Sequence, residues 1–162
     1  MNSESNKDQI NGKNNYTKFV GMLVASFIAM YSTMYLNTYV IDHVYFSLTR
    51  FYMSCLGIAT MAIIMFVAMR NMYQNKKKNI AIVFGSIVLF VGALGLVRDQ
   101  KSTVGDLLWM KAMIPHHSIA ILTSERADIK DPEVKRLAED IIEAQRKEIA
   151  EMKEMIERLE SE

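Results

Sequence analysis

The sequence predicts an all-α protein in which three transmembrane helices precede an antiparallel helical hairpin. Three observations favour this class. The first hundred residues contain three long apolar runs, the last sixty are densely charged with apolar residues at helical spacing, and the 162 residues include only seven Gly and two Pro. The chain is therefore expected to be a membrane region followed by a water-soluble module.

Composition excludes several classes of function. The chain carries 19 Lys and Arg against 18 Asp and Glu, so no strong positive field favours nucleic acid as a partner. Its one cysteine, Cys55, cannot form an intrachain disulfide, and no Cys and His spacing typical of zinc occurs. No phosphate-binding loop, dinucleotide fingerprint or activated nucleophile is present, so we do not expect an enzyme.

The N-terminal part is expected to be a polar tail followed by the membrane region. Residues 1–17 are rich in Asn, Ser and Lys and lack periodicity, which predicts disorder. Within residues 18–98 the spans are expected at about 19–41, 51–69 and 80–97. The first run carries no charge, and at 1.5 Å per residue it reaches about 35 Å, enough to cross a bilayer.

Lys and Arg in the short flanking segments predict the orientation of these spans. Seven cations lie on the side of the N-terminus and of the second loop: Lys7, Lys13, Lys18, Arg70, Lys76, Lys77 and Lys78. Four lie on the opposite side: Arg50, Arg98, Lys101 and Lys111. We therefore expect a multi-pass protein of the cytoplasmic (inner) membrane, with a cytoplasmic N-terminus and its C-terminal module facing the periplasm or cell exterior.

The C-terminal module, residues 99–162, is expected to form two antiparallel helices. Apolar residues recur at helical spacing over 104–127. The sequence Asp131-Pro132-Glu133 then supplies an N-cap, a proline at the first helical position and a first-turn carboxylate, which predicts a second helix to about Leu159. The connection is short, which is typical of a helical hairpin.

A single hairpin of two amphipathic helices buries too little apolar surface to be stable alone. We therefore expect the module to pair with a second copy, as a homodimer or higher homo-oligomer, and to close a four-helix bundle. The expected contact is the apolar stripe of the second helix: Val134, Ile141, Ile149, Met152 and Ile156.

The centre of the module combines imidazole and thioether groups. Met113 precedes His116 by three residues and His117 by four, so its sulfur can approach either ring, and Met110 extends the same stripe. Pro115 is expected to bend the helix near the histidines. Such ligands suit copper, particularly Cu(I), better than magnesium or calcium. The alternative is that the methionines are core filler.

The stretch DLLWMKAMIPHHSIAIL, followed by AEDIIEAQRKEIAEM, resembles the bacterial family catalogued as domain of unknown function 305, with its Met-Ile-Pro-His-His core and a later Glu-Ile-x-x-Met. The resemblance covers residues 100–160 and implies a ferritin-like hairpin that often dimerises, is usually exported and in some members is associated with copper binding or resistance. The implied metal ligands are Met110, Met113, His116, His117, Glu148 and Met152. The chain departs from the family pattern at Thr123, which occupies a methionine position.

Together these observations predict a membrane-anchored, extracytoplasmic metal-binding protein that holds a copper ion for binding or tolerance. The alternative is a structural, self-associating membrane protein without a metal. A di-iron oxidase is not expected, because Met113 and Ile114 stand where a Glu-x-x-His pair needs glutamate.

Two further features of the sequence allow more than one interpretation. The pair Asp42-His43 follows the first span on the same outer side as the module and is either a polar cap of that span or a ligand or docking contact. A stripe of methionines along the second span is either packing or a row of soft ligands: Met61, Met65, Met69 and Met72.

Overall fold

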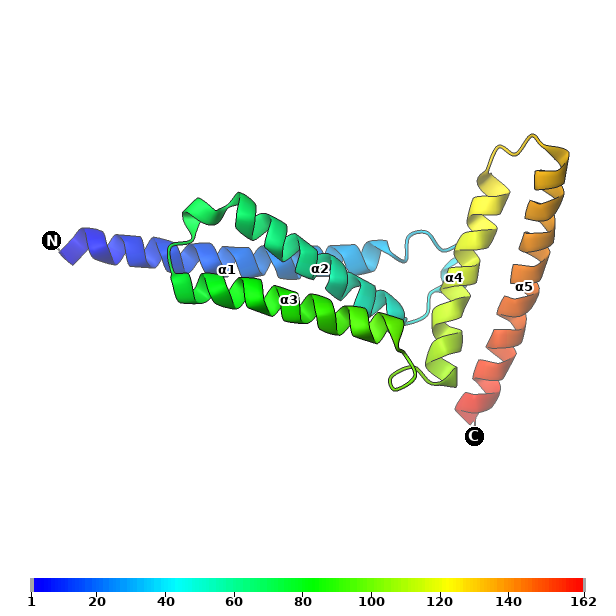
Figure 1. Ribbon diagram of the computed structural model, residues 1–162. Coiled ribbons are helices and arrows are strands. Elements are labelled where there is room, and N and C mark those ends of the chain that lie inside the picture. The colour runs from blue at the N-terminus through cyan, green and yellow to red at the C-terminus, as the bar shows by residue number, and fades with distance from the viewer. Residues whose placement is uncertain (1, 162) are drawn as a thin grey trace. The chain divides into compact units, whose positions relative to one another are not determined.

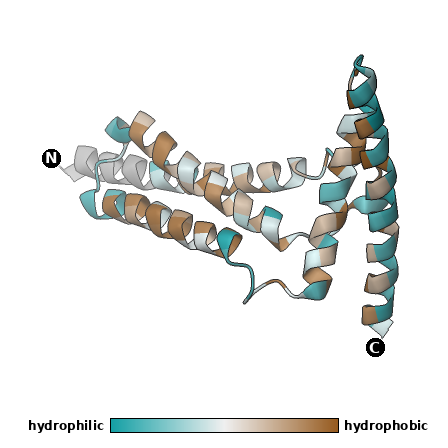
Figure 2. Ribbon diagram, turned by 45° about the vertical axis from the view of Figure 1, so that its right-hand side comes forward, coloured by the Kyte–Doolittle hydropathy of each residue, from teal (hydrophilic) through white to brown (hydrophobic). Residues whose placement is uncertain are grey.

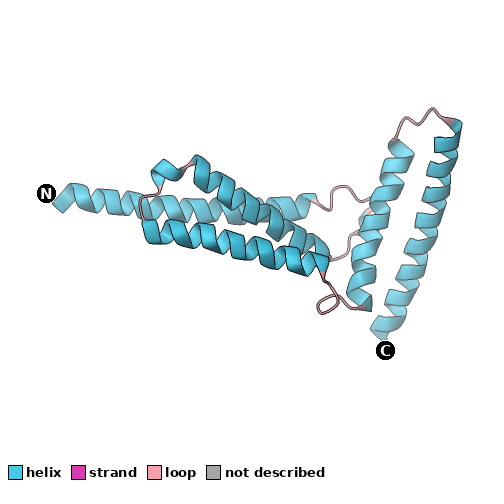
Figure 3. Ribbon diagram, viewed as in Figure 1, coloured by secondary structure: helices cyan, strands magenta, loops and turns pink. Residues whose placement is uncertain are grey.

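The computed structural model describes residues 2–161, with side chains from residue 15, and within that part of the chain it contains helices, turns and loops but no strand (Figures 1 and 3). The elements are α1 (Asn2–Thr33), η1 (Ile41–His43), α2 (Leu48–Ala68), η2 (Arg70–Met72), α3 (Lys76–Arg98), α4 (Asp106–Arg126) and α5 (Pro132–Ser161). The predicted all-α class is confirmed. The chain forms two compact units: unit 1 comprises residues up to 31 and 51–99, and unit 2 comprises 32–50 and 100 to the end of α5.

In unit 1, the residue ranges of α2 and α3 agree closely with those of the second and third predicted spans. Among the described residues, these two helices are long and apolar enough to cross a membrane. Large apolar side chains cover their outer faces, and Figure 2 shows the resulting hydrophobic colour along both helices: Ile64, Val67, Ile80, Phe84 and Val91 are each at least 60% exposed. Such a surface favours association with a membrane over exposure to water.

The first predicted span, residues 19–41, is wrong as a single helix, because α1 ends at Thr33. Beyond that residue, side chains satisfy the backbone groups that a helix would have paired. The Arg50 guanidinium donates to the Met34 carbonyl oxygen at 2.7 Å, and the Tyr35 hydroxyl accepts from the Ser47 amide at 3.1 Å. Within the described residues, two helices and not three have the length and apolar composition of a span.

At its other end α1 is longer than the sequence predicts. Residues 2–17, expected to be a disordered tail, form its first turns. Extending an existing helix requires no new nucleus, so polar residues can continue it at low cost. Further along, the Met30 side chain of α1 reaches Gly57 of α2, where a Cβ would lie 2.8 Å from the Met30 sulfur. A larger residue at position 57 would therefore require this flexible side chain to move.

Unit 2 contains the predicted hairpin of α4 and α5, and both helices begin and end within about two residues of the expected limits. The Asp131 carboxylate accepts from the amides of Glu133 at 2.9 Å and Val134 at 3.0 Å, which confirms the predicted N-cap. α4 begins without a side-chain cap, at Gly105, and runs uninterrupted through Pro115.

The hairpin core is built by large apolar residues of both helices: Met110, Ile114, Ile121, Ile149, Met152 and Ile156. This arrangement corrects the expected dimer contact, because Ile149, Met152 and Ile156 are already buried against α4 of the same chain. Ion pairs Lys111–Glu160 and Arg146–Glu125 join the two helices at separate levels. The hairpin therefore has a defined register.

The boundary predicted at residue 98 lies within one residue of the division between the two units, but unit 2 contains a further segment that was not predicted. Residues 32–50 belong to unit 2, where Tyr39 and Tyr45 pack against the hairpin core. Tyr39 and Tyr45 bury large aromatic surface on the hairpin, whereas several aliphatic residues of the same segment, such as Leu36 and Ile41, stay exposed. The loop segment 32–50 thus becomes a third layer of the hairpin.

Candidate metal centre

His117, near the middle of α4, is held by both of its ring nitrogens. Nδ1 lies 2.9 Å from the carbonyl oxygen of Met113, one turn earlier, and Nε2 lies 2.8 Å from Oε2 of Glu148 on α5. A carbonyl oxygen only accepts, so Nδ1 must carry a proton. That arrangement directs Nε2 toward α5, and a histidine that ligates a metal typically has its other nitrogen fixed in this way.

His117 lines a pocket of about 360 Å³ between α4 and α5. Five of the six predicted ligands line this pocket: Met110, Met113, His117, Glu148 and Met152. The side chains of Met110 and Met152 are more than 90% buried, while Glu148 reaches in from the solvent side. The pocket therefore combines thioether sulfurs, one imidazole and one carboxylate.

His116 lies outside this group. Its side chain is exposed, it does not line the pocket, and its ring centre is 6.2 Å from that of His117 with the rings at 73°. Consecutive residues on a helix diverge by about 100°, and α4 continues through Pro115 without a break that would realign the rings. The structure does not bring the two imidazoles to one centre.

The donor set decides which ions the pocket fits. In the part of the chain that the structure describes, no three His, Cys, Asp or Glu side chains cluster as a metal site. A hard ion such as magnesium or calcium, which requires several oxygen ligands, would find one carboxylate here. Methionine sulfur and imidazole instead match copper, and Cu(I) in particular. The residues present therefore fit a soft ion.

Three more residues line the pocket and were not predicted: Trp109, Glu151 and Met155. Met155 could have been found from the sequence, because it follows Glu148 by seven residues and Met152 by three and so shares their face of α5. Trp109 and Met155 are about half exposed, at 52% and 45%, and form part of the pocket's rim. An additional thioether is thus available at the entrance.

A second polar cluster joins the loop segment 32–50 to α4. Ser118 is fully buried, its Oγ accepts from the Tyr39 amide at 2.7 Å, and it lies 3.0 Å from Nδ1 of His43. A serine beside a histidine can act as a nucleophile, but this hydroxyl is closed to solvent and occupied by a backbone amide. The contact therefore docks the loop, one of the two roles that the sequence allowed for His43.

Charge reinforces this docking. Asp42 pairs with Lys153 of α5, and the hydrogen bond and charge of Lys153 lower the pKa of the Asp42 carboxyl below its usual value. Burial is the largest cause that lowers the pKa of His43, and the nearby Lys153 cation acts in the same direction, while Asp42 opposes them. His43 is therefore more easily kept neutral than an ordinary histidine, as a ring packed against Ser118 requires.

Comparison with known proteins adds the following findings. The sequence model described as "Domain of unknown function (DUF305)" matches residues 94–159, which include α4 and most of α5. An uncharacterized protein of Acanthamoeba polyphaga mimivirus is 35% identical over 139 residues, which cover 84% of this chain and 89% of the viral protein. No solved structure matches significantly. The similarity to the viral protein thus extends beyond the hairpin, which alone is shorter than the aligned length.

Proposed function

Because the chain belongs to the family described as domain of unknown function (DUF305), we propose that it is a membrane-anchored protein whose hairpin binds a soft metal ion, with copper as the best fit. The ligands would be the Nε2 of His117 and the sulfurs of Met110, Met113 and Met152, with Glu148 beside the imidazole. The protein would bind copper or confer tolerance to it, and not catalyse a reaction.

One observation supports this proposal most directly: the Met113 carbonyl fixes Nδ1 of His117, whose side chain lines one pocket with Met110, Met113 and Met152. The Glu148 carboxylate now contacts the same nitrogen. A metal ion would replace the proton on Nε2, and Glu148 could then join as a ligand or stay as a neighbour that orients the ring.

The anchor part of the proposal rests on unit 1. The hydroxyl of Tyr16 on α1 lies 2.6 Å from Oδ1 of Asn79, so this part of α1 lies beside the start of α3. α1 therefore runs beside α2 and α3 from that level to Tyr31, which meets Phe51 of α2. That stretch covers about 22 Å, and a short apolar segment is accommodated by bilayer thinning or by flanking side chains.

The proposed orientation places the N-terminus and the α2–α3 connection in the cytoplasm, and the loop segment 32–50 and the hairpin outside. This assignment agrees with the grouping of residues 32–50 and 100–161 in one unit, since both segments then emerge on the same side of the membrane. A cysteine introduced at Ser161 should react with an impermeant reagent in intact cells. Reaction only after the membrane is opened would contradict the orientation.

Titration of Cu(I) into the full-length protein in detergent, under reducing conditions at neutral pH, tests metal binding. We expect His117→Ala to abolish tight binding and the neighbouring His116→Ala to leave it unchanged, which makes the two histidines a matched pair. Glu148→Gln should weaken affinity by about 10- to 100-fold without changing the stoichiometry if the carboxylate only orients the ring. Binding that survives replacement of His117, Met110 and Met113 together would refute the site.

Self-association of the hairpin is the second candidate function, and exposed apolar residues favour it. Val134 and Leu137 on α5 are 50% and 58% exposed, and Trp109 and Met155 are exposed at the pocket rim. A second copy covering the rim would close a four-helix bundle around the methionines. Sedimentation of the full-length protein, wild type against a Leu137→Lys variant, tests this arrangement, and a monomeric wild type would exclude it.

A further inference from the structure

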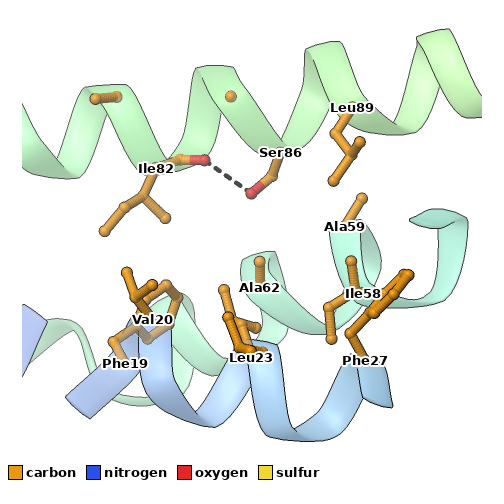
Figure 4. Close-up of a pocket in the computed structure, with 13 residues that line it drawn as sticks. Phe19, Val20, Leu23, Phe27, Ile58, Ala59, Ala62, Ile82, Ser86 and Leu89 are labelled. Carbon is orange, nitrogen blue, oxygen red and sulfur yellow. Dashed lines mark hydrogen bonds between the residues drawn. The ribbon is translucent and has the colours of Figure 1, made fainter. Parts of the chain in front are cut away.

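Unit 1 contains a groove of about 420 Å³ between its three helices (Figure 4). Phe19, Leu23 and Phe27 of α1 form one wall, small residues of α2 form the floor, and α3 supplies the opposite wall with Gly85, Ser86 and Leu89. This volume falls in the range of about 300–1,000 Å³ that is typical of small-molecule sites. The groove is thus large enough for a ligand and not a packing defect of a single side chain.

The groove is apolar and accessible from the side. Its only hydroxyl, that of Ser86, donates to the Ile82 carbonyl of its own helix at 2.8 Å, so its proton is already used within the helix. Val20, Val24 and Leu89 at the rim are 56%, 53% and 42% exposed. In a bilayer such a groove fills with hydrocarbon, because an apolar void beside lipid would lose contacts on every wall.

One end of the groove meets an aromatic and cationic rim. Phe19 contacts the Tyr73 ring at 5.5 Å between centres, and Tyr16, one turn before Phe19, contacts the same ring at 5.1 Å. Lys78 lies 4.9 Å above the Tyr16 ring and precedes the groove residue Ile82 by one turn of α3. Tyrosine and lysine at this level are typical of the membrane interface, so the groove runs inward from the headgroup region.

The cations at this rim lack carboxylate partners. The sequence contains no Asp or Glu over residues 9–41 or 43–98, which include nearly all of unit 1. Lys18, Lys76 and Lys77 are exposed and make no ion pair within the described part of the chain. Among the described side chains of unit 1, this positive charge therefore has no carboxylate in an ion pair with it, and it lies beside an apolar groove.

We infer that unit 1 binds an anionic phospholipid, with one acyl chain in the groove and the phosphate beside Lys78 and its neighbour Lys77 in the first turn of α3. This inference rests on the membrane part of the proposed function and is independent of the metal. An acyl chain alone would fill the apolar groove, and free phosphate alone would pair with the lysines. Only an anionic lipid does both, because its phosphate and acyl chain are joined in one molecule and the lysines lie beside the end of the groove. The site would hold one lipid through extraction while the surrounding bilayer exchanges.

Lipid retention by the full-length protein tests the inference. The protein is reconstituted in vesicles of equal phosphatidylglycerol and phosphatidylcholine with identical chains, extracted in mild detergent, and analysed by native mass spectrometry. Wild type should retain phosphatidylglycerol preferentially. Lys77→Gln and Lys78→Gln should each reduce this preference by about fivefold, whereas Lys135→Gln on α5 should leave it unchanged.

Glycines of α3 provide a matched pair for the groove itself. A Cβ at Gly85 or at Gly92 would meet no atom within 4 Å, so both positions accept a side chain, but only Gly85 lines the groove. Gly85→Leu should lower retention of both lipids by about tenfold because it occupies space for several methylenes, and Gly92→Leu should not. Equal retention in the two variants, or a disulfide dimer formed by Gly85→Cys in membranes, would overturn the inference.

Carbonate washing of membranes separates failure of this inference from failure of the proposed function. Release of the protein by carbonate would refute the membrane anchor, and with it the lipid site. Protein that stays in the membrane but retains both lipids equally would refute anionic-lipid binding alone. The copper titration is unaffected by either outcome, since its ligands lie in unit 2.

Discussion

α3 and α5 are both long helices, but they bury opposite kinds of residue. α5 buries Ile149, Met152 and Ile156 and exposes its charged residues, as a helix in water does. α3 buries only Ser86 and Ala93 among its described residues and exposes its large apolar side chains. Small residues inside and large apolar residues outside are typical of helices in lipid, where close backbone approach replaces the hydrophobic effect. The same chain therefore follows two packing rules.

Of the changes that test this difference between the two units, a charge introduced into the hairpin core should lower the free energy of unfolding the most. Ile114 is fully buried between α4 and α5, so Ile114→Asp should lower the free energy of unfolding by about 4 kcal/mol or more, because the carboxylate has no partner there. Urea unfolding of the full-length protein in detergent measures it. Ile114→Val, with an expected cost of about 1 kcal/mol, is the control. Equal effects would show that the hairpin core is not packed as described.

Removing the docking hydroxyl should have the next largest effect. Ser118→Ala leaves the Tyr39 amide buried without its acceptor, which costs about 1–3 kcal/mol. Hydrogen exchange at residues 39–43 should accelerate, while exchange within α5 should not change. Ser124→Ala on the same helix is the matched control. If hydrogen exchange at Tyr39 is unchanged in the Ser118 variant, the loop segment 32–50 is not docked on the hairpin through Ser118.

Alanine at two glycines compares packing within unit 1. Gly57→Ala brings a methyl group against the Met30 side chain and should cost about 1 kcal/mol, since the flexible methionine gives way only in part. Gly85→Ala meets no atom within 4 Å and should stabilise α3 by about 0.5–1 kcal/mol through the lower entropy of the unfolded chain. Thermal unfolding in detergent measures both. Two shifts of the same sign would contradict the described approach of α1 and α2.

Acidification should have the smallest effect, confined to the docked loop. The pKa of His43 is lowered chiefly by burial, so the unfolded chain takes up a proton first, and stability is full above pH 6.5 and falls as pH drops below it. Asp42, whose pKa is lowered by Lys153, adds a further loss only below pH 3.8. Exchange at residues 39–43 should therefore accelerate between pH 7.5 and 5.5. His43→Gln should abolish this pH dependence of the exchange rate. If the pH dependence persists in that variant, a group other than His43 causes it.

Local signals in the sequence were sufficient to predict the two helices of the hairpin. Asp131 and Pro132 start α5 where the capping chemistry predicts, and the periodic apolar residues define both helices. Five of the six predicted ligands meet at one pocket, because helical spacing places them on facing surfaces. His116 does not, since adjacent positions on a helix cannot share a face.

Tertiary contacts explain what the sequence could not predict. The end of α1 at Thr33 depends on bonds from Arg50 and Ser47, distant residues that no local pattern identifies. The dimer contact was misassigned because an apolar stripe does not specify whether its partner lies in the same chain or in another. The docking of Tyr39 on Ser118 joins positions 79 residues apart and carries no spacing signal.

That separation also sets an order of events during synthesis. Tyr39 leaves the ribosome 79 residues before Ser118, and Asp42 leaves 111 residues before Lys153. At about 5–20 residues per second, the loop waits roughly 4–16 s for α4 alone. During that interval α2 and α3 are synthesised in full, so both helices are complete before the loop can dock. A chain that stalls before α5 would carry the helices of unit 1 and an undocked loop with exposed aromatic residues, the form most accessible to proteases and chaperones.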